Sequence, residues 1–78
     1  MTLKELRRGQ SARIDKVDSS KPGVVRLMVL GLTEGTEVRY QNAAIGGDPM
    51  EISVLGTSIS VRRQQADSFL VSPLTANG

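Results

Sequence analysis

The chain has 78 residues, and its ten lysines and arginines against eight acidic residues give a formal net charge of +2. Hydrophobic residues make up 38% of the chain and aromatic residues 3%, so we expect one small domain with an aliphatic core. The sequence contains no cysteine and no histidine. This composition excludes a disulfide framework, a thiolate nucleophile, a sulfur-ligated metal site and a histidine general base.

The N-terminal segment predicts a helical turn in a cytoplasmic protein. Thr2 and Glu5 have the spacing of a capping box, which predicts one helical turn over residues 3–8, closed by Gly9. The segment is charged where a secretory signal would need an apolar run, so we expect a cytoplasmic location. The most apolar stretch, residues 24–32, is about half the ~20 residues that a membrane-spanning helix needs, so we expect no direct membrane insertion.

Alternation of apolar and polar side chains predicts five short strands. They are expected at residues 10–17, 38–42, 50–54, 59–61 and 69–71. A glycine-rich break at residues 46–49 separates the second strand from the third, and a hairpin at 55–58 joins the third to the fourth. Residues 63–67 are expected to form a helical turn. Short strands at this spacing favour a small closed or nearly closed barrel.

Residues 24–30 have apolar side chains at helical spacing, but their valines favour a strand. Pro22 before the segment and Gly31 after it match the asymmetry of helix ends, so we predict a short helix. Apolar residues, including Leu32 just beyond, cover nearly its whole circumference, whereas a barrel can bury only one side. Either the helix plugs one end of the barrel, or it offers an apolar patch with Arg26 at its rim to a protein partner.

The remaining polar residues identify no catalytic group and no cofactor. Asp48 and Glu51 fall on opposite faces of an extended segment, which is poor geometry for a shared metal ion, so no metal site is predicted. Neither glycine-rich phosphate-binding motif is present. Tyr40 is the one candidate for stacking on nucleic-acid bases, because Phe69 falls in an apolar alternation. We therefore expect no nucleic-acid partner, and a small nucleic-acid-binding barrel is kept as an alternative.

Three motifs follow one another along the chain: RLMVLGLTEGTEV, a GDP turn followed by a hairpin through Gly56, and RRQQADSFLV. The residues that carry the first and last motifs are Arg26, Leu27, Leu30, Gly31, Leu32, Gly35 and Val38, and then Arg62 or Arg63, Ala66, Leu70 and Val71. In order and spacing these motifs resemble those of the ferrous-iron transport protein A (FeoA) family over residues 3–71. The sequence departs from the family where Val25 precedes Arg26, since further arginines are common there, and at Ala44, near which a proline is common.

The resemblance implies a mainly β fold: a small Src-homology-3-like (SH3-like) barrel of about five strands with one or two short helices, covering residues 1–73, with a frayed tail at 74–78. It also implies a cytoplasmic accessory protein that is not an enzyme and that binds and modulates a membrane ferrous-iron permease with a GTP-binding domain, the FeoB type. Such a protein would sit at the inner face of the membrane through its partner. The expected contact residues are Arg26, Leu27, Leu30, Leu32, Gly47, Asp48 and Pro49.

Other interpretations are left open at this stage. The same barrel is similar to the C-terminal domain of metal-dependent transcriptional repressors, although we see no DNA-binding helical domain or metal ligands in the sequence. Self-association is a further alternative, because an exposed apolar helix can pair with its own copy. Whether the chain activates, inhibits or assembles the permease is likewise open.

Overall fold

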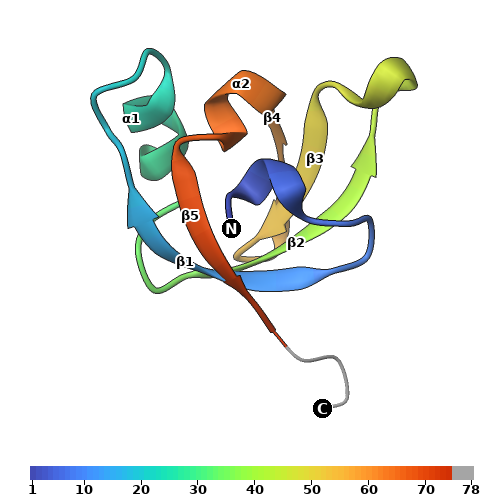
Figure 1. The fold of residues 1–78 in the computed structure, drawn as a ribbon, viewed down its shortest axis with the longest axis horizontal. Coiled ribbons are helices and arrows are strands. Elements are labelled where there is room, and N and C mark those ends of the chain that lie inside the picture. Colours follow the sequence, from blue (N-terminus) through green and yellow to red (C-terminus); the bar gives the residue numbers. More distant parts are fainter. Residues whose placement is uncertain (75–78) are drawn as a thin grey trace.

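The computed structural model describes residues 1–74, which form one antiparallel sheet with short helices around it (Figure 1). The strands are β1 (Ser11–Val17), β2 (Glu37–Ala43), β3 (Met50–Val54), β4 (Thr57–Val61) and β5 (Phe69–Pro73). The helical segments are the 3-10 turns η1 (Leu3–Glu5) and η2 (Ile45–Gly47) and the α-helices α1 (Val24–Val29) and α2 (Arg63–Ala66). The predicted mainly β fold with five strands is confirmed.

The sheet has the strand order β4-β3-β2-β1-β5 and bends around the core (Figure 1). Ala12 of β1 lies opposite Val38 of β2, and Val38 lies opposite Val54 of β3, so one apolar row crosses three strands. The strands β4 and β5 form the two edges, and α2 connects them along the chain and lies across the opening between them (Figure 1). The result is the nearly closed small barrel that the strand spacing predicts.

The core is built from aliphatic side chains that alternate along the strands. In β3 the first, third and fifth residues are buried and the two between them are partly exposed. Phe69 is fully buried, as its alternation predicts, and Tyr40 is 5% exposed. Each buried Val, Leu, Ile or Met contributes about 1.5 to 3 kcal/mol to the free energy of unfolding. A core of this kind suits a chain with so few aromatic residues.

The segment whose sequence suited both helix and strand is the helix α1, as predicted. It packs against the barrel through Val24 and Leu27, which are fully buried. Leu30 follows in a helical conformation (φ −79°, ψ −5°). Gly31 then takes a φ of 123°, which residues with a β-carbon resist, so the glycine allows the chain to leave the helix and enter the next turn. The helix thus covers the barrel with one face and exposes the other.

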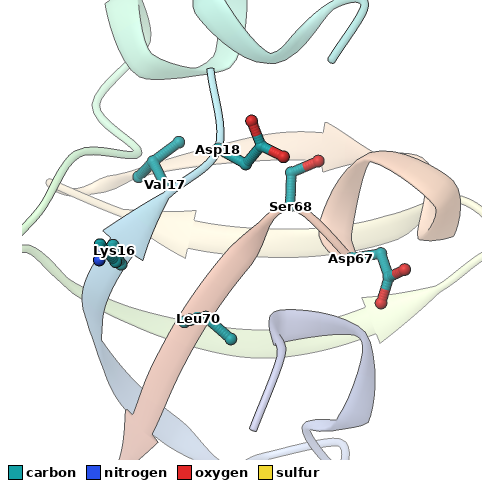
Figure 2. Close-up of a pocket in the computed structure, with 6 residues that line it drawn as sticks. All are labelled: Lys16, Val17, Asp18, Asp67, Ser68 and Leu70. Carbon is teal, nitrogen blue, oxygen red and sulfur yellow. The ribbon is translucent and has the colours of Figure 1, made fainter. Parts of the chain in front are cut away.

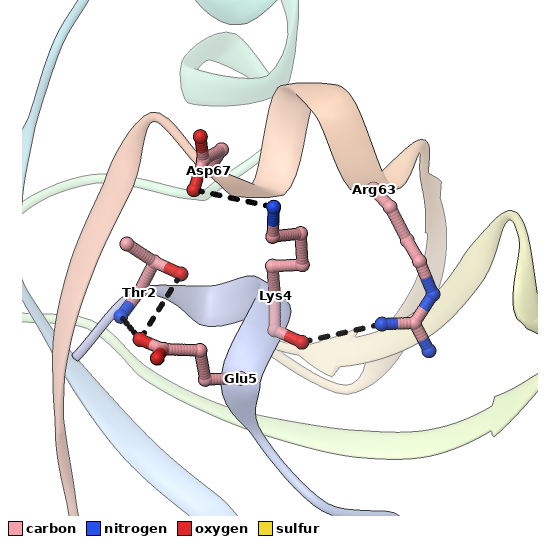
Figure 3. Close-up of polar contacts among 5 residues, drawn as sticks. All are labelled: Thr2, Lys4, Glu5, Arg63 and Asp67. Atoms are coloured by element: carbon pink, nitrogen blue, oxygen red, sulfur yellow. Dashed lines mark hydrogen bonds and ion pairs between the residues drawn. The ribbon is translucent and has the colours of Figure 1, made fainter.

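The first helical turn is shorter than predicted. The Thr2 N–H donates to the Glu5 carboxylate at 2.7 Å and the Thr2 hydroxyl donates to it at 3.4 Å (Figure 3), as expected for half of a capping box. The N–H is the main cause of the lowered pKa of Glu5. The helix does not extend over residues 3–8, because Leu6 is extended (φ −64°, ψ 147°) and reaches the core with 4% exposure. Gly9, with a φ of 87°, belongs to a separate turn.

Two details of the fold lie in loops. The 3-10 turn η2 was not predicted and occupies the glycine-rich break before β3, where Ile45 is fully exposed and the Asp48–Pro49 peptide bond is cis. At the C-terminal end, the Leu74 N–H donates to the Ser11 carbonyl oxygen at 2.9 Å, so the first residue of the expected frayed tail continues the alignment of β5. Residues 75–78 of that tail lie outside the described part of the chain.

Arg63 at the start of α2 connects three distant segments. Its guanidinium group donates to the Lys4 carbonyl oxygen at 3.2 Å (Figure 3), to the Gly47 carbonyl oxygen at 2.5 Å and to the Tyr40 hydroxyl at 3.2 Å. The Lys4 ammonium in turn lies 3.7 Å from the Asp67 carboxylate, an exposed pair of small energetic value. The partly buried guanidinium therefore ties η1, η2 and β2 to α2.

Replacing this arginine tests the role of its guanidinium. We expect Arg63→Met to lower the free energy of unfolding by about 2 to 3 kcal/mol, because three acceptors lose a charged donor. The matched change Arg62→Met, at an exposed neighbour, should alter it by less than about 0.5 kcal/mol. Urea unfolding midpoints with an unchanged denaturant slope measure both values. Equal losses in the two variants would contradict this role.

Candidate functional site

The predicted contact residues on and near α1 divide between surface and core. Arg26 is exposed and Leu30 is 44% exposed, so both are accessible to a partner. Leu27 and Leu32 are fully buried, and this part of the prediction is corrected. Both leucine side chains point into the core of the barrel. A fully buried side chain cannot contact a partner unless the core opens.

The glycine-rich turn of the prediction has a structural role of its own. The Gly47 carbonyl oxygen accepts the Nε–H of Arg63, and the Asp48 carboxylate accepts the Arg63 backbone N–H at 3.0 Å. That N–H belongs to the first turn of α2 and would otherwise have no acceptor in the helix, so Asp48, just before the neighbouring strand β3, caps α2. Pro49 is partly buried beside it. A direct contact between this turn and a partner stays a prediction.

The structure brings the turn near the beginning of α1 and not near its apolar face. Asp48 lines a hollow of about 490 Å³ together with Pro22 and Gly23, which precede the helix, and with residues of α2 such as Gln65. The Gln65 side chain packs against Gly23, where an added β-carbon would lie 2.4 Å from its amide nitrogen. The two segments expected to form one contact surface therefore meet at the N-terminal end of α1.

An apolar patch lies on the exposed face of α1 and continues past its C-terminal end. Val25 and Val29 lie one turn apart on α1 and are 57% and 81% exposed. Leu55, in the turn between β3 and β4, is 77% exposed, and its Cδ1 atom would lie 3.1 Å from a β-carbon added to Gly31. Val25, Val29, Leu30 and Leu55 form what we call the apolar patch.

The sequence prediction missed Leu55, although the sequence contains a signal for it. Val54 pairs with Thr57, so the hairpin has a two-residue loop, Leu55–Gly56, with φ values of 51° and 79°. Such a turn favours asparagine or aspartate followed by glycine, because the first position needs a positive φ. An exposed leucine there adds backbone strain and exposed apolar surface, which makes its side chain a candidate for a role in binding.

A further hollow lies beside the end of β1 and the beginning of β5. The hollow has a volume of about 220 Å³. Figure 2 shows Asp18, Asp67 and Ser68 lining it together with the apolar side chains of Val17 and Leu70. The pKa of Asp18 is lowered because the Ser20 hydroxyl and N–H both donate to its carboxylate. Residues 1–74 contain no group of three or more side chains that could hold a metal ion.

Tyr40 is not placed to stack on nucleic-acid bases. Its ring is buried in the core, and its hydroxyl accepts a hydrogen bond from Arg63 at 3.2 Å. Binding of single strands by small barrels relies on exposed aromatic rings. The one aromatic residue that the sequence offered for this role is therefore part of the barrel interior.

A model of the FeoA domain matches residues 1–73 of this chain. The chain belongs to the FeoA family. Among solved structures, this FeoA chain is 36% identical to the FeoA protein from Chlorobium tepidum over 96% of its own length and 71% of that chain, with a TM-score of 0.86. A search of curated proteins returned no match.

A second solved structure is FeoA from Stenotrophomonas maltophilia in complex with zinc, described as a prokaryotic SH3 domain protein. It is 32% identical over 92% of this chain and 89% of that one, with a TM-score of 0.80. The SH3-like fold is thereby confirmed. A manganese-dependent transcriptional repressor also matches 95% of this FeoA chain, with a TM-score of 0.80 and 13% identity, which shows a shared fold only.

These findings place the chain in a family linked to ferrous-iron transport. No helix within residues 1–74 is long and apolar enough to cross a membrane.

The strained leucine of the apolar patch can be tested directly. We expect Leu55→Asn to leave the free energy of unfolding unchanged or to raise it by up to about 1 kcal/mol, because Asn-Gly suits this turn and tolerates the positive φ. The same change should weaken binding of a partner protein to the apolar patch. Thermal unfolding measures the first effect and a pull-down the second. A variant that is markedly less stable would show that Leu55 serves packing.

Proposed function

We propose that this protein is a small cytoplasmic accessory factor that binds the FeoB-type ferrous-iron permease and modulates its transport, with the apolar patch as its contact. Membership of the FeoA family supports the link to iron transport. The relative from Stenotrophomonas maltophilia is described as a candidate activating factor for bacterial ferrous-iron transport, which supports a modulating role. In this proposal the chain catalyses no reaction, and the permease handles the iron.

The exposed apolar patch is the observation that carries the proposal. Val29 and Leu55 are 81% and 77% exposed, and both lie on elements that the core holds in place. Leu55 lies beside Gly31, two residues after Val29, and exposed apolar side chains on neighbouring segments are typical of a protein contact surface, whereas single scattered ones need no explanation. Arg26 lies on the same helix and is exposed at the rim, where arginine is common in interfaces.

Two alternatives to this proposal are a repressor-like role and self-association. The repressor matches reach 13% and 18% identity, so they carry the fold and no function. Self-association would use the same apolar patch as permease binding, because an exposed helix face is available to a second copy as well. Sedimentation of the purified chain distinguishes a dimer from a monomer before any partner is added.

A pull-down from detergent-solubilised membranes of the source cell tests the proposal. The native chain should recover the iron permease, and Leu30→Asp should reduce recovery by about tenfold or more, since a charge in the centre of an apolar contact is strongly unfavourable. Leu70→Asp is the matched control, because Leu70 lies on β5 outside the patch and is 47% exposed against 44% for Leu30.

The control decides how a loss is interpreted. If both aspartate variants lose the permease, the cause is a general effect on folding or solubility, and the apolar patch is not the contact. If the native chain recovers no permease while both variants fold, the proposed function is wrong. Circular dichroism melting curves of all three proteins establish that they fold.

A further inference from the structure

A groove crosses the outer face of β1, β2 and β3. Apart from Leu55, it contains no residue of the apolar patch or of the glycine-rich turn. One part of it is a hollow of about 810 Å³ lined by Arg7, Arg8, Ser11, Glu37 and Arg39 among others. An adjoining hollow of about 280 Å³ shares Ser11, Glu37 and Arg39 with the first. This second hollow extends to Leu55, so the groove runs from a basic end to the apolar patch. We call it the arginine groove.

The charged groups of three arginines in the groove have no partner among the described residues. In the part of the chain that spans residues 1–74, the guanidinium groups of Arg7, Arg8 and Arg39 make no ion pair or hydrogen bond. Arg13, in contrast, pairs with Asp15 at 3.4 Å. Among the described residues that line the groove, Glu37 is the one acid. The groove thus carries an excess of positive charge.

The backbone holds these arginines at fixed places. The turn that contains Arg7 and Arg8 is closed by the Gln10 N–H, which donates to the Arg7 carbonyl oxygen at 2.9 Å. It is fastened to β2 because the Gly9 N–H donates to the Tyr40 carbonyl oxygen at 2.7 Å, next to Arg39. The frame fixes the backbone at these arginines, so a ligand has to order only their side chains.

Guanidinium groups favour carboxylates and phosphates, because their planar N–H groups match two oxygens at once. A concave surface with one sign of charge also raises the local concentration of opposite charges. The groove is concave, which suits a chain segment better than a flat bilayer surface. No aromatic ring is available for stacking, since Tyr40 is buried, and this disfavours a single-stranded nucleic acid.

We infer that the arginine groove binds an acidic, extended segment of a partner protein, with carboxylates on Arg7, Arg8 and Arg39 and an apolar side chain against Leu55. The continuity between the basic hollow and Leu55 carries this inference, because one segment can occupy both ends. The identity of that partner as the permease rests on the proposed function. The inference that the groove binds an acidic segment rests only on its arginines and its shape, and not on the proposed function.

A peptide of consecutive glutamates ending in two leucines, labelled with a fluorophore, is the probe. The native chain should bind it about tenfold or more tightly than the matching glutamine peptide, and binding should weaken steeply between about 50 and 200 mM salt, as expected for charged contacts at a surface. The triple variant Arg7→Gln, Arg8→Gln, Arg39→Gln should lose about tenfold or more in affinity.

A second triple variant removes the same amount of charge elsewhere. Lys16→Gln, Lys21→Gln and Arg62→Gln all change exposed residues outside the groove, and should alter affinity less than about twofold. If both triple variants bind equally weakly, the attraction is general and the groove is not a site. If pyrophosphate or vesicles of phosphatidylcholine with phosphatidylglycerol bind through these arginines while the glutamate peptide does not, the inference is likewise overturned.

The permease pull-down separates this inference from the proposed function. Loss of the permease with the groove variant, together with peptide binding, supports both. Recovery of the permease by the groove variant but not by Leu30→Asp keeps the proposed function and overturns the groove as a permease contact. Peptide binding through the arginines without any capture of the permease keeps the acidic-segment site and refutes the proposed function.

Discussion

The guanidinium group of Arg63 joins three parts of the chain that lie far apart in sequence. Its three acceptors belong to the N-terminal turn η1, to the glycine-rich turn η2 and to the strand β2. Carbonyl groups that are partly buried need donors, and a charged donor satisfies them more strongly than a neutral one. The Asp48 carboxylate completes the arrangement because it accepts the N–H of the same arginine. The guanidinium group thereby fastens the N-terminal turn, which also forms an isolated bridge from Thr2 to Leu70 of β5, to the glycine-rich turn and to α2.

This fastening explains why the surface features sit at defined places. The turn with Arg7 and Arg8 follows η1 directly and is fastened to β2, so the position of the arginine groove depends on how η1 is docked. The apolar patch depends on a different contact, between Leu55 of the β3–β4 hairpin and Gly31 after α1. Each surface combines a loop with a regular element: the turn of Arg7 and Arg8 with β2, and the Leu55 turn with α1.

The comparison with transcriptional repressors shows how little the barrel itself says about function. A repressor domain with 13% identity has the same fold with a TM-score of 0.80. The backbone elements and the aliphatic core therefore meet the requirements of folding and leave the choice of partner to the surface. In this FeoA protein the surface combines exposed aliphatic residues beside Gly31 with unpaired arginines on the outer face of the sheet. Leu55 has a positive φ, a conformation that leucine rarely adopts and that costs backbone strain.

The amino-acid sequence by itself determined the local elements and the family. Period-two alternation located all five strands, and Pro22 and Gly31 bounded the helix correctly, because these signals act through neighbouring residues. The end of the first helical turn was missed because Leu6 leaves the helix to reach a core that other segments form. The turn η2 was missed as well. In such short turns tertiary contacts outweigh weak local preferences, so the sequence pattern is a poor guide to them.

Only the tertiary structure decided which side chains face outward. Leu27 and Leu30 are both leucines in the same apolar segment, and the sequence does not distinguish them. The first is buried and the second is 44% exposed, because the barrel covers one face of α1. Likewise, the sequence motif fits Arg62 or Arg63, and the structure assigns the connecting role to Arg63, whose side chain points toward acceptors from three distant segments. Which face of a helix is covered, and which distant atoms a side chain meets, follow from the packing of elements that are remote in sequence, so no local pattern contains that information.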